Sequence, residues 1–316
     1  MRIFRYQSPV PKEIQNAAIA IGNFDGVHIG HASLIKEAGK IAANKNIPFS
    51  ILTFEPHPKS IFLQKSKPFR ITPFRTKVQE LKKLGLHTLI IKQFNNQFSN
   101  CTAENFVKKI LVEELNANHI IAGSDFVFGH NRAGGCDLLF KMGAELGFSF
   151  TPINPIESIE KKVYSSTNIR KYLELGALHK VKMNLGRYYS IQGRIAHGDK
   201  LGRKLGFPTA NIFLGDHIRP KYGVYAVHLC FIDDSKKGSV NGVANIGIRP
   251  TIGGNNELLE VFIFNFKENI YGQRVKVDLI EYLRPEIKFN NLELMVAEMK
   301  RDIKRAKNLL KTKSND

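Results

Sequence analysis

Cysteine and long apolar segments are scarce in this chain of 316 residues. Its cysteines, Cys101, Cys136 and Cys230, lie far apart and form no CxxC pair. This distribution suits a reducing compartment and argues against a structural zinc site. The first residues, MRIFRYQSPVPKE, lack the apolar core of a signal peptide, and no apolar run approaches the roughly 20 residues that span a bilayer. We therefore expect a cytoplasmic protein without a membrane partner.

Acidic residues are also few, with 28 Asp and Glu against 47 Lys and Arg, a formal net charge of +19. Such a balance admits RNA, an anionic membrane or phosphorylated small molecules as partners, and charge alone does not choose among them. Only the segment KRDIKRAKNLLKTK near the C-terminus is a dense basic run. The remaining lysines are scattered, which a Lys-, Asn- and Ile-rich composition on solvated faces explains equally well.

Apolar strands alternate with helical stretches through about residue 183, and no internal repeat or low-complexity segment interrupts them. Alternation of this kind predicts an α/β domain with a Rossmann-like parallel sheet and helices on both faces, which we place at residues 1–184. Ligands in such folds bind at the carboxyl ends of the strands. The expected strands are AIAIGNF, FSILTF, TLIIKQF, HIIAGSDF and FTPINPI. The helix after the first strand has an apolar side made of Leu34, Ile35, Ala38, Ile41 and Ala42.

Strand patterns follow one another without helices from about residue 187, separated by Gly, Pro, Asn and Asp. Six such strands predict a small closed antiparallel β-barrel, in a second domain at residues 185–316. A terminal helix should start near Asn290, because NNLE offers an N-cap followed by Glu293. The apolar stripe of that helix is Leu292, Met295, Val296, Met299 and Ile303.

The segment GNFDGVHIGH, residues 22–31, carries the first chemical signal. It places His28 and His31 where a strand gives way to a helix, and Gly30 between them allows a close backbone approach. A helix N-terminus attracts anions, and two imidazole donors can stabilise charge that develops on a transferred phosphoryl group. Two surface histidines on a capped helix are the plainer interpretation of an isolated HxxH pattern.

Residues 28–31 spell HIGH, so an aminoacyl-tRNA synthetase is one alternative. Such enzymes also carry a KMSKS-like loop, whereas this chain has only KVKMNL. Its serine-rich element is SSTNIRKYLELG at residues 165–176. Together with GNFDGVHIGH, TFEPHP at 53–58 and AGSDFVFGHNRAGG at 122–135, this element resembles the adenylyltransferase domain of the bacterial bifunctional riboflavin kinase/FAD synthetase family.

The resemblance implies which residues of the first domain bind substrates. One departure is Asn168, where the family usually has arginine, which leaves Arg170 as the better phosphate ligand. The implied ATP ligands are Gly22, Phe24, Asp25, His28, His31, Ser165, Thr167 and Arg170, with His28 and His31 as catalytic groups. The implied flavin-binding residues are Phe54, Pro56, His57, Pro58 and Asp125. Without the resemblance, the two prolines could be a rigid strand exit and Asp125 a turn cap.

The second domain opens with the glycine-rich segment GRIAHGDKLGRKLGFPTANI, residues 193–212. Its spacing matches neither GxxxxGK[ST] nor GxGxxG, and a glycine-rich hairpin is the plainer interpretation. The run GFPTAN resolves the choice, because it resembles the flavokinase domain of the same bifunctional family. So do the runs KYGVYAV, GVANIGIRPTIGG, LLEVFIFNF, YGQRV and YLRPEIKF.

Thr209 and Asn211 lie on one side of an extended PTANI segment, and their oxygens suit Mg²⁺ beside ATP phosphates. By resemblance, Glu260 is the general base for the riboflavin 5′-hydroxyl. The family commonly has His and Asp where this chain has Phe262 and Asn265. The implied ATP ligands are Gly193, Gly198, Lys200, Gly202, Gly206, Pro208, Thr209 and Asn211, and the implied flavin ligands are Arg249, Arg284 and Glu286.

The resemblance covers essentially the whole chain and implies a bifunctional enzyme. The barrel would phosphorylate riboflavin to FMN, and the first domain would transfer AMP from ATP to FMN, giving FAD and pyrophosphate. Mg²⁺ is the implied cofactor, ATP the co-substrate, and no nucleic-acid partner is expected; the oligomeric state is left open. Two alternatives remain at this stage. The fold could retain only one activity, or a basic RNA-binding protein could use a retired nucleotidyltransferase fold.

Overall fold

A computed structural model describes residues 1–6, 10–62, 68–157, 163–197, 206–234, 238–251 and 254–312. The chain divides into two compact units. Unit 1 contains Met1–Ser66 and Thr72–Ser165, and unit 2 contains Lys67–Ile71 and Ser166–Asp316. Each unit has its own core and is described separately.

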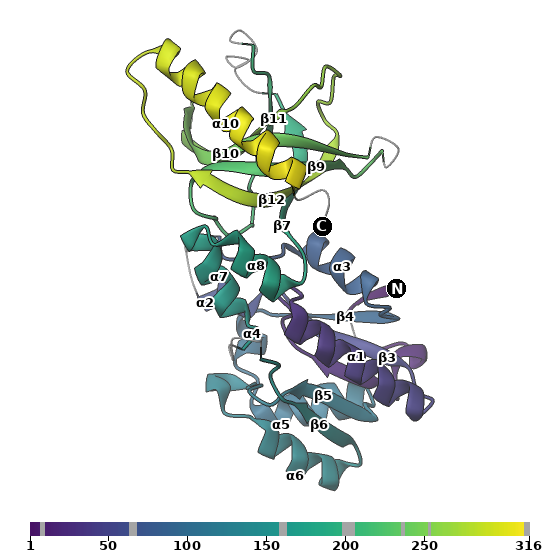
Figure 1. Ribbon diagram of the computed structural model, residues 1–316. Helices are drawn as coiled ribbons and strands as arrows, with labels where there is room; N and C mark the ends of the chain where they lie inside the picture. The colour runs from purple at the N-terminus through teal and green to yellow at the C-terminus, as the bar shows by residue number, and fades with distance from the viewer. Residues whose placement is uncertain are drawn as a thin grey trace. The chain divides into compact units, whose positions relative to one another are not determined.

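Unit 1 is built on a six-stranded sheet in the order β1-β4-β3-β2-β5-β6, in which every neighbouring pair is parallel (Figure 1). This confirms the predicted Rossmann-like sheet. The edge strand β1 was not predicted, because it is short and mostly exposed. The strands are β1 Arg2–Arg5, β2 Ala18–Ile21, β3 Phe49–Glu55, β4 Thr88–Gln93, β5 His119–Gly123 and β6 Ser149–Ile153.

Helices cover both faces of this sheet. Successive residues of a strand point to opposite faces, so neighbouring residues pack against different helices. Ala18 and Ala20 belong to the core cluster under α1 and α3, whereas Ile19 and Ile21 belong to the cluster under η2 and α6. The helices that precede or cover the sheet are η1 Lys12–Ile14, α1 Ile29–Asn44, α2 Pro58–Phe62 and α3 Phe74–Lys83. Further along lie α4 Asn96–Ser99, α5 Ala103–Asn105, η2 Phe106–Glu114, η3 His130–Arg132 and α6 Cys136–Leu146.

The sheet order reverses between β2 and β5, because the chain adds β3 and β4 on one side of β2 and then β5 and β6 on the other. A crevice forms at the carboxyl ends of strands flanking such a switch point. The segments that leave β2, β3 and β5 here are the GNFDGVHIGH, TFEPHP and AGSDFVFGHNRAGG runs. The topology therefore gathers three of the four adenylyltransferase-like motifs at one edge.

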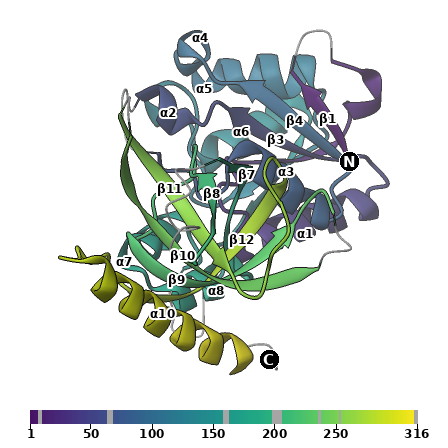
Figure 2. The same cartoon turned by 90° about the horizontal axis from the view of Figure 1, so that it is seen from above.

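Unit 2 is a closed antiparallel barrel with the strand order β10-β11-β8-β7-β12-β9, as predicted (Figure 2). Alternate strand residues fill its interior, among them Ile191, Ile212, Leu259 and Val277. The strands are β7 Tyr189–Ala196, β8 Thr209–Phe213, β9 Gly223–Phe231, β10 Ser239–Thr251, β11 Gly254–Ile263 and β12 Arg274–Arg284.

Helices α7 (Ser166–Leu175) and α8 (Leu178–Leu185) also belong to unit 2. Leu173 and Val181 share a buried core cluster with the barrel interior. The predicted domain boundary between residues 184 and 185 coincides with the end of α8 and stays a prediction.

The terminal helix α10 (Leu292–Thr312) runs along the outside of the barrel beside β9 and β10 (Figures 1 and 2). The backbone N–H of Leu294 donates to Asn291 Oδ1 at 2.9 Å, so the NNLE run supplies the expected cap. Its second half packs through Ala306 and Leu310.

Across the part of the chain that the structure describes, no helix combines the length and apolar character needed to cross a bilayer. Cys101, Cys136 and Cys230 are free thiols.

Tyrosine burial in unit 2 predicts a loss of stability at alkaline pH. Burial, helped by a hydrogen bond to Glu257, raises the pKa of Tyr222 to about 12. Burial also raises the pKa of Tyr225. Tyrosine in the unfolded chain ionises near pH 10, whereas the folded protein keeps these hydroxyls protonated to a higher pH. Their contribution to the free energy of unfolding is therefore complete below about pH 10 and is lost as the pH rises through the folded-state pKa values.

The measurement is denaturant unfolding followed by circular dichroism at about pH 9 and about pH 11. We expect the unfolding midpoint to fall at the higher pH, and to fall less in Tyr225→Phe than in the control Tyr188→Phe. An equal fall in both variants would contradict the assignment.

Candidate active sites

The turn between β2 and α1 has an unusual backbone. Phe24 and Val27 have φ values of 48° and 41°, and Gly26 has a φ of 91°. Residues that have a Cβ rarely adopt this left-handed backbone conformation. A Cβ on Gly22 would lie 3.1 Å from the Phe24 ring, so the glycine lets that ring fold back against the strand end.

The two histidines lie against each other at the start of α1. The backbone N–H of His31 donates to His28 Nδ1 at 3.3 Å, which makes His28 the N-cap. Because Nδ1 accepts, the proton of neutral His28 lies on Nε2. The imidazole rings stack with centroids 3.6 Å apart, and Phe24 packs edge-on against His31 at 5.3 Å.

Gly30 suits this packing, because a side chain there would crowd its neighbours. A Cβ there would lie 3.2 Å from two atoms of the His28 ring and 3.3 Å from the carbonyl oxygen of Tyr164. The expected close approach at Gly30 is therefore observed: the His28 side chain and the backbone of Tyr164 both lie close to this glycine.

A cavity of about 760 Å³ opens at this edge of the sheet, and predicted site residues line it: Gly22, Phe24, His31, Phe54, His57 and Asp125. Pro58 also lines it. Its apolar walls are phenylalanine rings, of which Phe54 contacts Phe94, Phe98 and Phe106 at centroid distances of 5.9 to 6.3 Å. A cavity lined by aromatic rings suits a flat aromatic ligand.

Most of these rings were not predicted from the sequence. Phe94 and Phe98 follow β4 in the run QFNNQF, and Phe106 begins η2. The signal available in the sequence was the concentration of phenylalanine in the segment that follows β4.

Asp25 is buried, with 3% of its surface exposed, and does not line the cavity. Its Oδ1 accepts hydrogen bonds from the backbone N–H of Thr72 at 3.0 Å and from Thr72 Oγ1 at 3.3 Å. Thr72 Oγ1 in turn accepts from the backbone N–H of Gly26 at 2.8 Å. In this structure Asp25 therefore holds the turn.

The serine-rich motif is divided between the two units. Ser165 belongs to unit 1, whereas Thr167 and Arg170 lie on α7 of unit 2. Arg170 Nε donates to the carbonyl oxygen of Phe69 at 3.0 Å, and its guanidinium lies 5.7 Å from the Phe69 ring centroid. Their roles as ATP ligands stay predictions.

The second site lies on the outer face of the barrel, where three neighbouring strands align polar side chains. Glu260 of β11 pairs across the ladders with Asn211 of β8 and with Asn245 of β10. Thr209 pairs with Phe262 and so lies on the same face, since residues two apart along a strand point to the same side. Asn211 Oδ1 is buried and accepts no hydrogen bond from the residues that the structure describes.

A cavity of about 200 Å³ lies beside this row, although Asn211 itself does not line it. Thr209, Asn245, Glu260 and Phe262 form the barrel side. The terminal helix closes the other side with Met295, Met299 and Ile303. Part of the predicted apolar stripe of that helix therefore faces a cavity.

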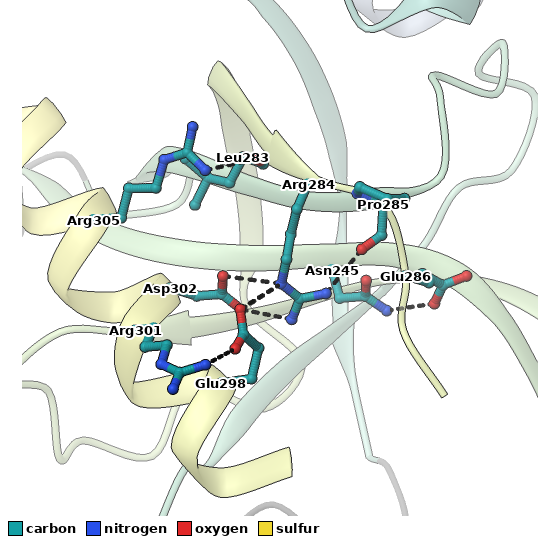
Figure 3. Close-up of polar contacts among 9 residues, drawn as sticks. All are labelled: Asn245, Leu283, Arg284, Pro285, Glu286, Glu298, Arg301, Asp302 and Arg305. Atoms are coloured by element: carbon teal, nitrogen blue, oxygen red, sulfur yellow. Dashed lines mark hydrogen bonds and ion pairs between the residues drawn. The ribbon is translucent and has the colours of Figure 1, made fainter. Parts of the chain in front are cut away.

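Arg284 at the end of β12 joins the helix to the barrel (Figure 3). Its guanidinium donates to both carboxylate oxygens of Asp302, with nitrogen–oxygen distances of 2.7 to 3.2 Å. Glu298 lies 3.7 Å away on the preceding turn of α10. Arg284 was predicted to bind flavin; here it lines the cavity and pairs with Asp302, which the sequence analysis did not single out.

Glu286 lies beside the same cavity, and its Oε1 accepts a hydrogen bond from Asn245 Nδ2 at 2.9 Å (Figure 3). A Cβ on Gly247 would overlap the Glu286 carboxylate, so this glycine makes the approach possible. Asn245 was also missed; as a polar residue in the apolar run GVANIG, it offered the same signal as Glu260.

The glycine-rich segment is described only at its ends. Gly193 packs against Ile212, with no room for a Cβ, and Gly206 has a φ of 85°. Pro208 immediately precedes β8. Gly198, Lys200 and Gly202 lie outside the described residues, and so does the side chain of Arg249 on β10.

The three departures from the family pattern occupy different places. Phe262 lines the barrel cavity, and Asn265 lies in a turn with a φ of 53°. Asn168 is in the first turn of α7. Their effects on binding stay predictions.

Comparison with known proteins agrees with this geometry. The FAD synthetase family model matches residues 10–168, and the riboflavin kinase family model matches residues 185–310. A bifunctional riboflavin kinase/FMN adenylyltransferase from Haemophilus influenzae is 37% identical over 97% of this chain and 98% of that protein. The chain belongs to the bifunctional riboflavin kinase/FMN adenylyltransferase family. This confirms the resemblance inferred from the motifs.

Other members of the bifunctional riboflavin kinase/FMN adenylyltransferase family are similarly close. The protein of the same name from Buchnera aphidicola subsp. Schizaphis graminum is 38% identical over 96% of this chain and 97% of its own length. The Escherichia coli K12 protein is 36% identical over 93% of this chain and 92% of its own length. A solved Streptococcus pneumoniae structure, described as a macrolide-efflux protein, matches with a TM-score of 0.82 and 27% identity over 96% of this chain and 97% of that one.

For this family member we predict that Asp302→Ala destabilises unit 2 by about 3 kcal/mol, because it removes the bidentate partner of Arg284 and leaves the guanidinium only the longer contact with Glu298 at 3.7 Å. The side chains of Arg284 and Asp302 are only 15% and 8% exposed. Denaturant unfolding followed by circular dichroism measures the loss.

The matched control is Arg301→Ala. Arg301 also pairs with a carboxylate of α10, but its side chain is 77% exposed, so the cost should stay below about 1 kcal/mol. Equal losses of unfolding free energy in the two variants would contradict the prediction that the buried pair stabilises the barrel more than the exposed pair does.

Proposed function

We propose that unit 2 transfers the γ-phosphate of ATP to riboflavin and that unit 1 transfers AMP from ATP to the resulting FMN. The observation that carries the first assignment is the row Asn211–Glu260–Asn245 across three strands, of which Glu260 and Asn245 line a cavity. The stacked pair His28 and His31 beside an aromatic cavity carries the second.

In the kinase reaction, Glu260 accepts the proton of the riboflavin 5′-hydroxyl as that oxygen attacks the γ-phosphorus. The bond from the γ-phosphorus to the bridging oxygen breaks, and ADP leaves with the electron pair. Asn211 and Asn245 flank the carboxylate on the neighbouring strands and can orient it and the hydroxyl.

Thr209 and Asn211 fit a divalent cation at the phosphates. Asn211 is 9% exposed, and its orphaned Oδ1 is a hard oxygen acceptor two residues from the Thr209 hydroxyl. Bound Mg²⁺ would supply charge neutralisation of the phosphate oxygens. The other proposed ATP-binding residues of this site are Gly193, Gly198, Lys200, Gly202, Gly206 and Pro208.

The isoalloxazine ring would lie between the barrel and α10, where Phe262, Met295 and Met299 provide apolar and polarisable surface. Arg284 and Glu286 bring charge to the same cavity. With Arg249, they are the proposed polar contacts to the flavin.

In the adenylyl transfer, a phosphate oxygen of FMN attacks the α-phosphorus of ATP, and pyrophosphate leaves. The attacking group is already anionic, so no base is needed. His28 and His31 stabilise the charge on the α-phosphate oxygens, and the first turn of α1 adds its backbone donors. Gly22, Phe24 and Asp25 would shape the ATP turn, and Ser165, Thr167 and Arg170 would complete the phosphate contacts.

The flavin of FMN would stack in the phenylalanine-lined cavity of unit 1. Phe54, His57 and Pro58 form the wall that leaves β3, Pro56 shapes its path, and Asp125 supplies a hydrogen-bond acceptor. Riboflavin, FMN and ATP are thus the proposed partners, with no nucleic acid among them. The cytoplasmic location stays a prediction.

His31→Ala should abolish FAD formation from FMN and ATP while riboflavin phosphorylation continues. Removal of one preorganised donor at the transferred phosphate should cost about 100-fold or more in kcat. Chromatographic assays of FMN and FAD, each started from its own substrate, measure the two reactions. Equal loss of both would contradict the assignment of one reaction to each unit.

Glu260→Gln should lower FMN formation by about 10²–10⁴-fold, because the amide keeps the shape of the side chain but cannot accept the hydroxyl proton. FAD formation from supplied FMN should persist, which excludes global misfolding. Asp278→Asn is the matched control, since Asp278 lies in the same barrel but pairs with Lys276 at 3.0 Å. A Glu260→Gln enzyme with the parental rate and pH profile would overturn the assignment.

A further inference from the structure

Helix α3 carries none of the motifs in the sequence, yet Lys77 of this helix contacts the turn at residues 23–26, as does Thr72 just before it. We propose that Lys77 of α3 is a positioning residue of the adenylyltransferase site, holding this turn in the conformation that presents Phe24, His28 and His31. The inference rests on the proposed function of unit 1.

Lys77 is a buried ammonium. Only 2% of the residue is exposed. Its Nζ lies 2.7 Å from Glu55 Oε1, 3.3 Å from Thr53 Oγ1 and 3.3 Å from the carbonyl oxygen of Asn23. Two of these contacts are hydrogen bonds donated by the ammonium, to Thr53 Oγ1 and to the carbonyl oxygen of Asn23, and the third is an ion pair with the Glu55 carboxylate.

The three acceptors come from the two segments that build the proposed site. Asn23 belongs to the turn after β2, which continues into the histidines. Thr53 and Glu55 are at the end of β3, which continues into the wall of the flavin cavity at His57. Lys77 therefore ties the nucleotide side of the site to its flavin side through one nitrogen atom.

The turn needs such support because Phe24 and Val27 have positive φ values. Conformations of this kind persist only where surrounding contacts determine them. Thr72, which lies just before α3 and is 5% exposed, holds Asp25 and Gly26. Lys77, five residues further on, holds Asn23. Together these two residues contact three residues of the turn, Asn23, Asp25 and Gly26.

Burial of a charge at this place is costly unless every partner is present. Elsewhere on α3 the chain places lysine at the surface: Lys83 pairs with Glu80 at 2.7 Å with 64% of its side chain exposed. Lys83 is therefore a matched control on the same helix.

The test compares Lys77→Met, the double variant Lys77→Met with Glu55→Gln, and Lys83→Met. The double variant removes both charges and leaves none unpaired, which separates positioning from charge compensation. FAD formation is measured at saturating ATP and FMN, and FMN formation from riboflavin is measured in the same preparations. All rates are expressed per folded protein, from circular dichroism unfolding curves.

We expect kcat for FAD formation to fall about 100-fold in both Lys77 variants, the size of the loss when one preorganised group is misplaced. The rate of FMN formation should change less than about twofold, and Lys83→Met should match the parent in both reactions. A purely stabilising role would instead lower the folded fraction and leave kcat of the folded protein unchanged.

Recovery of the parental kcat in the double variant would overturn the proposal, because Lys77 would then serve only to neutralise Glu55. Thr72→Val provides a second measurement should the Lys77 variants not fold. It removes the hydroxyl that contacts Asp25 and Gly26, and it should lower kcat for FAD formation about tenfold; an unchanged kcat would also overturn the proposal. If the parent itself makes no FAD, the proposed function fails instead.

Discussion

Strand register is the constraint on which both sites depend. In the barrel, the antiparallel ladders place Glu260 opposite Asn211 and Asn245, with Val261 and Leu259 directed inward. A shift of one residue would exchange those faces, because side chains alternate along a strand. In the parallel sheet, register brings the ends of β2, β3 and β5 to one edge, where the cavity opens. Each site therefore follows from backbone pairing before any side chain contributes.

Buried ion pairs then hold what the register has assembled. Arg284 joins β12 to α10 through Asp302, and Lys77 joins α3 to β3 through Glu55. The pair Arg284–Asp302 lines the barrel cavity, and Lys77 contacts Asn23, which lines the cavity of unit 1. Burying such charges is rarely the cheapest way to stabilise a fold, so their location beside the sites favours a role in geometry.

The sequence predicted the sheet, the barrel and the terminal helix because their apolar periods are strong and uninterrupted. It predicted His28, His31, Glu260, Thr209 and Asn211 through motifs that concentrate chemistry in short runs. It missed β1, whose four residues are mostly exposed, and the phenylalanines after β4. It also missed Asp302, since an aspartate in KRDIKR has the local pattern of a solvated helix face, and only packing against β12 shows it to be buried.

Local sequence therefore determined the fold class of both units and predicted candidate reactive groups, because period, turn residues and motifs are properties of neighbouring positions. Tertiary structure alone decided which charged side chains are buried and at which glycines another residue packs too closely to leave room for a Cβ. Lys77 and Lys83 belong to one helix and look alike in sequence, yet one is 2% exposed and the other is at the surface. The difference arises from β3 and from the turn after β2, distant in sequence, which the fold places against only one side of that helix.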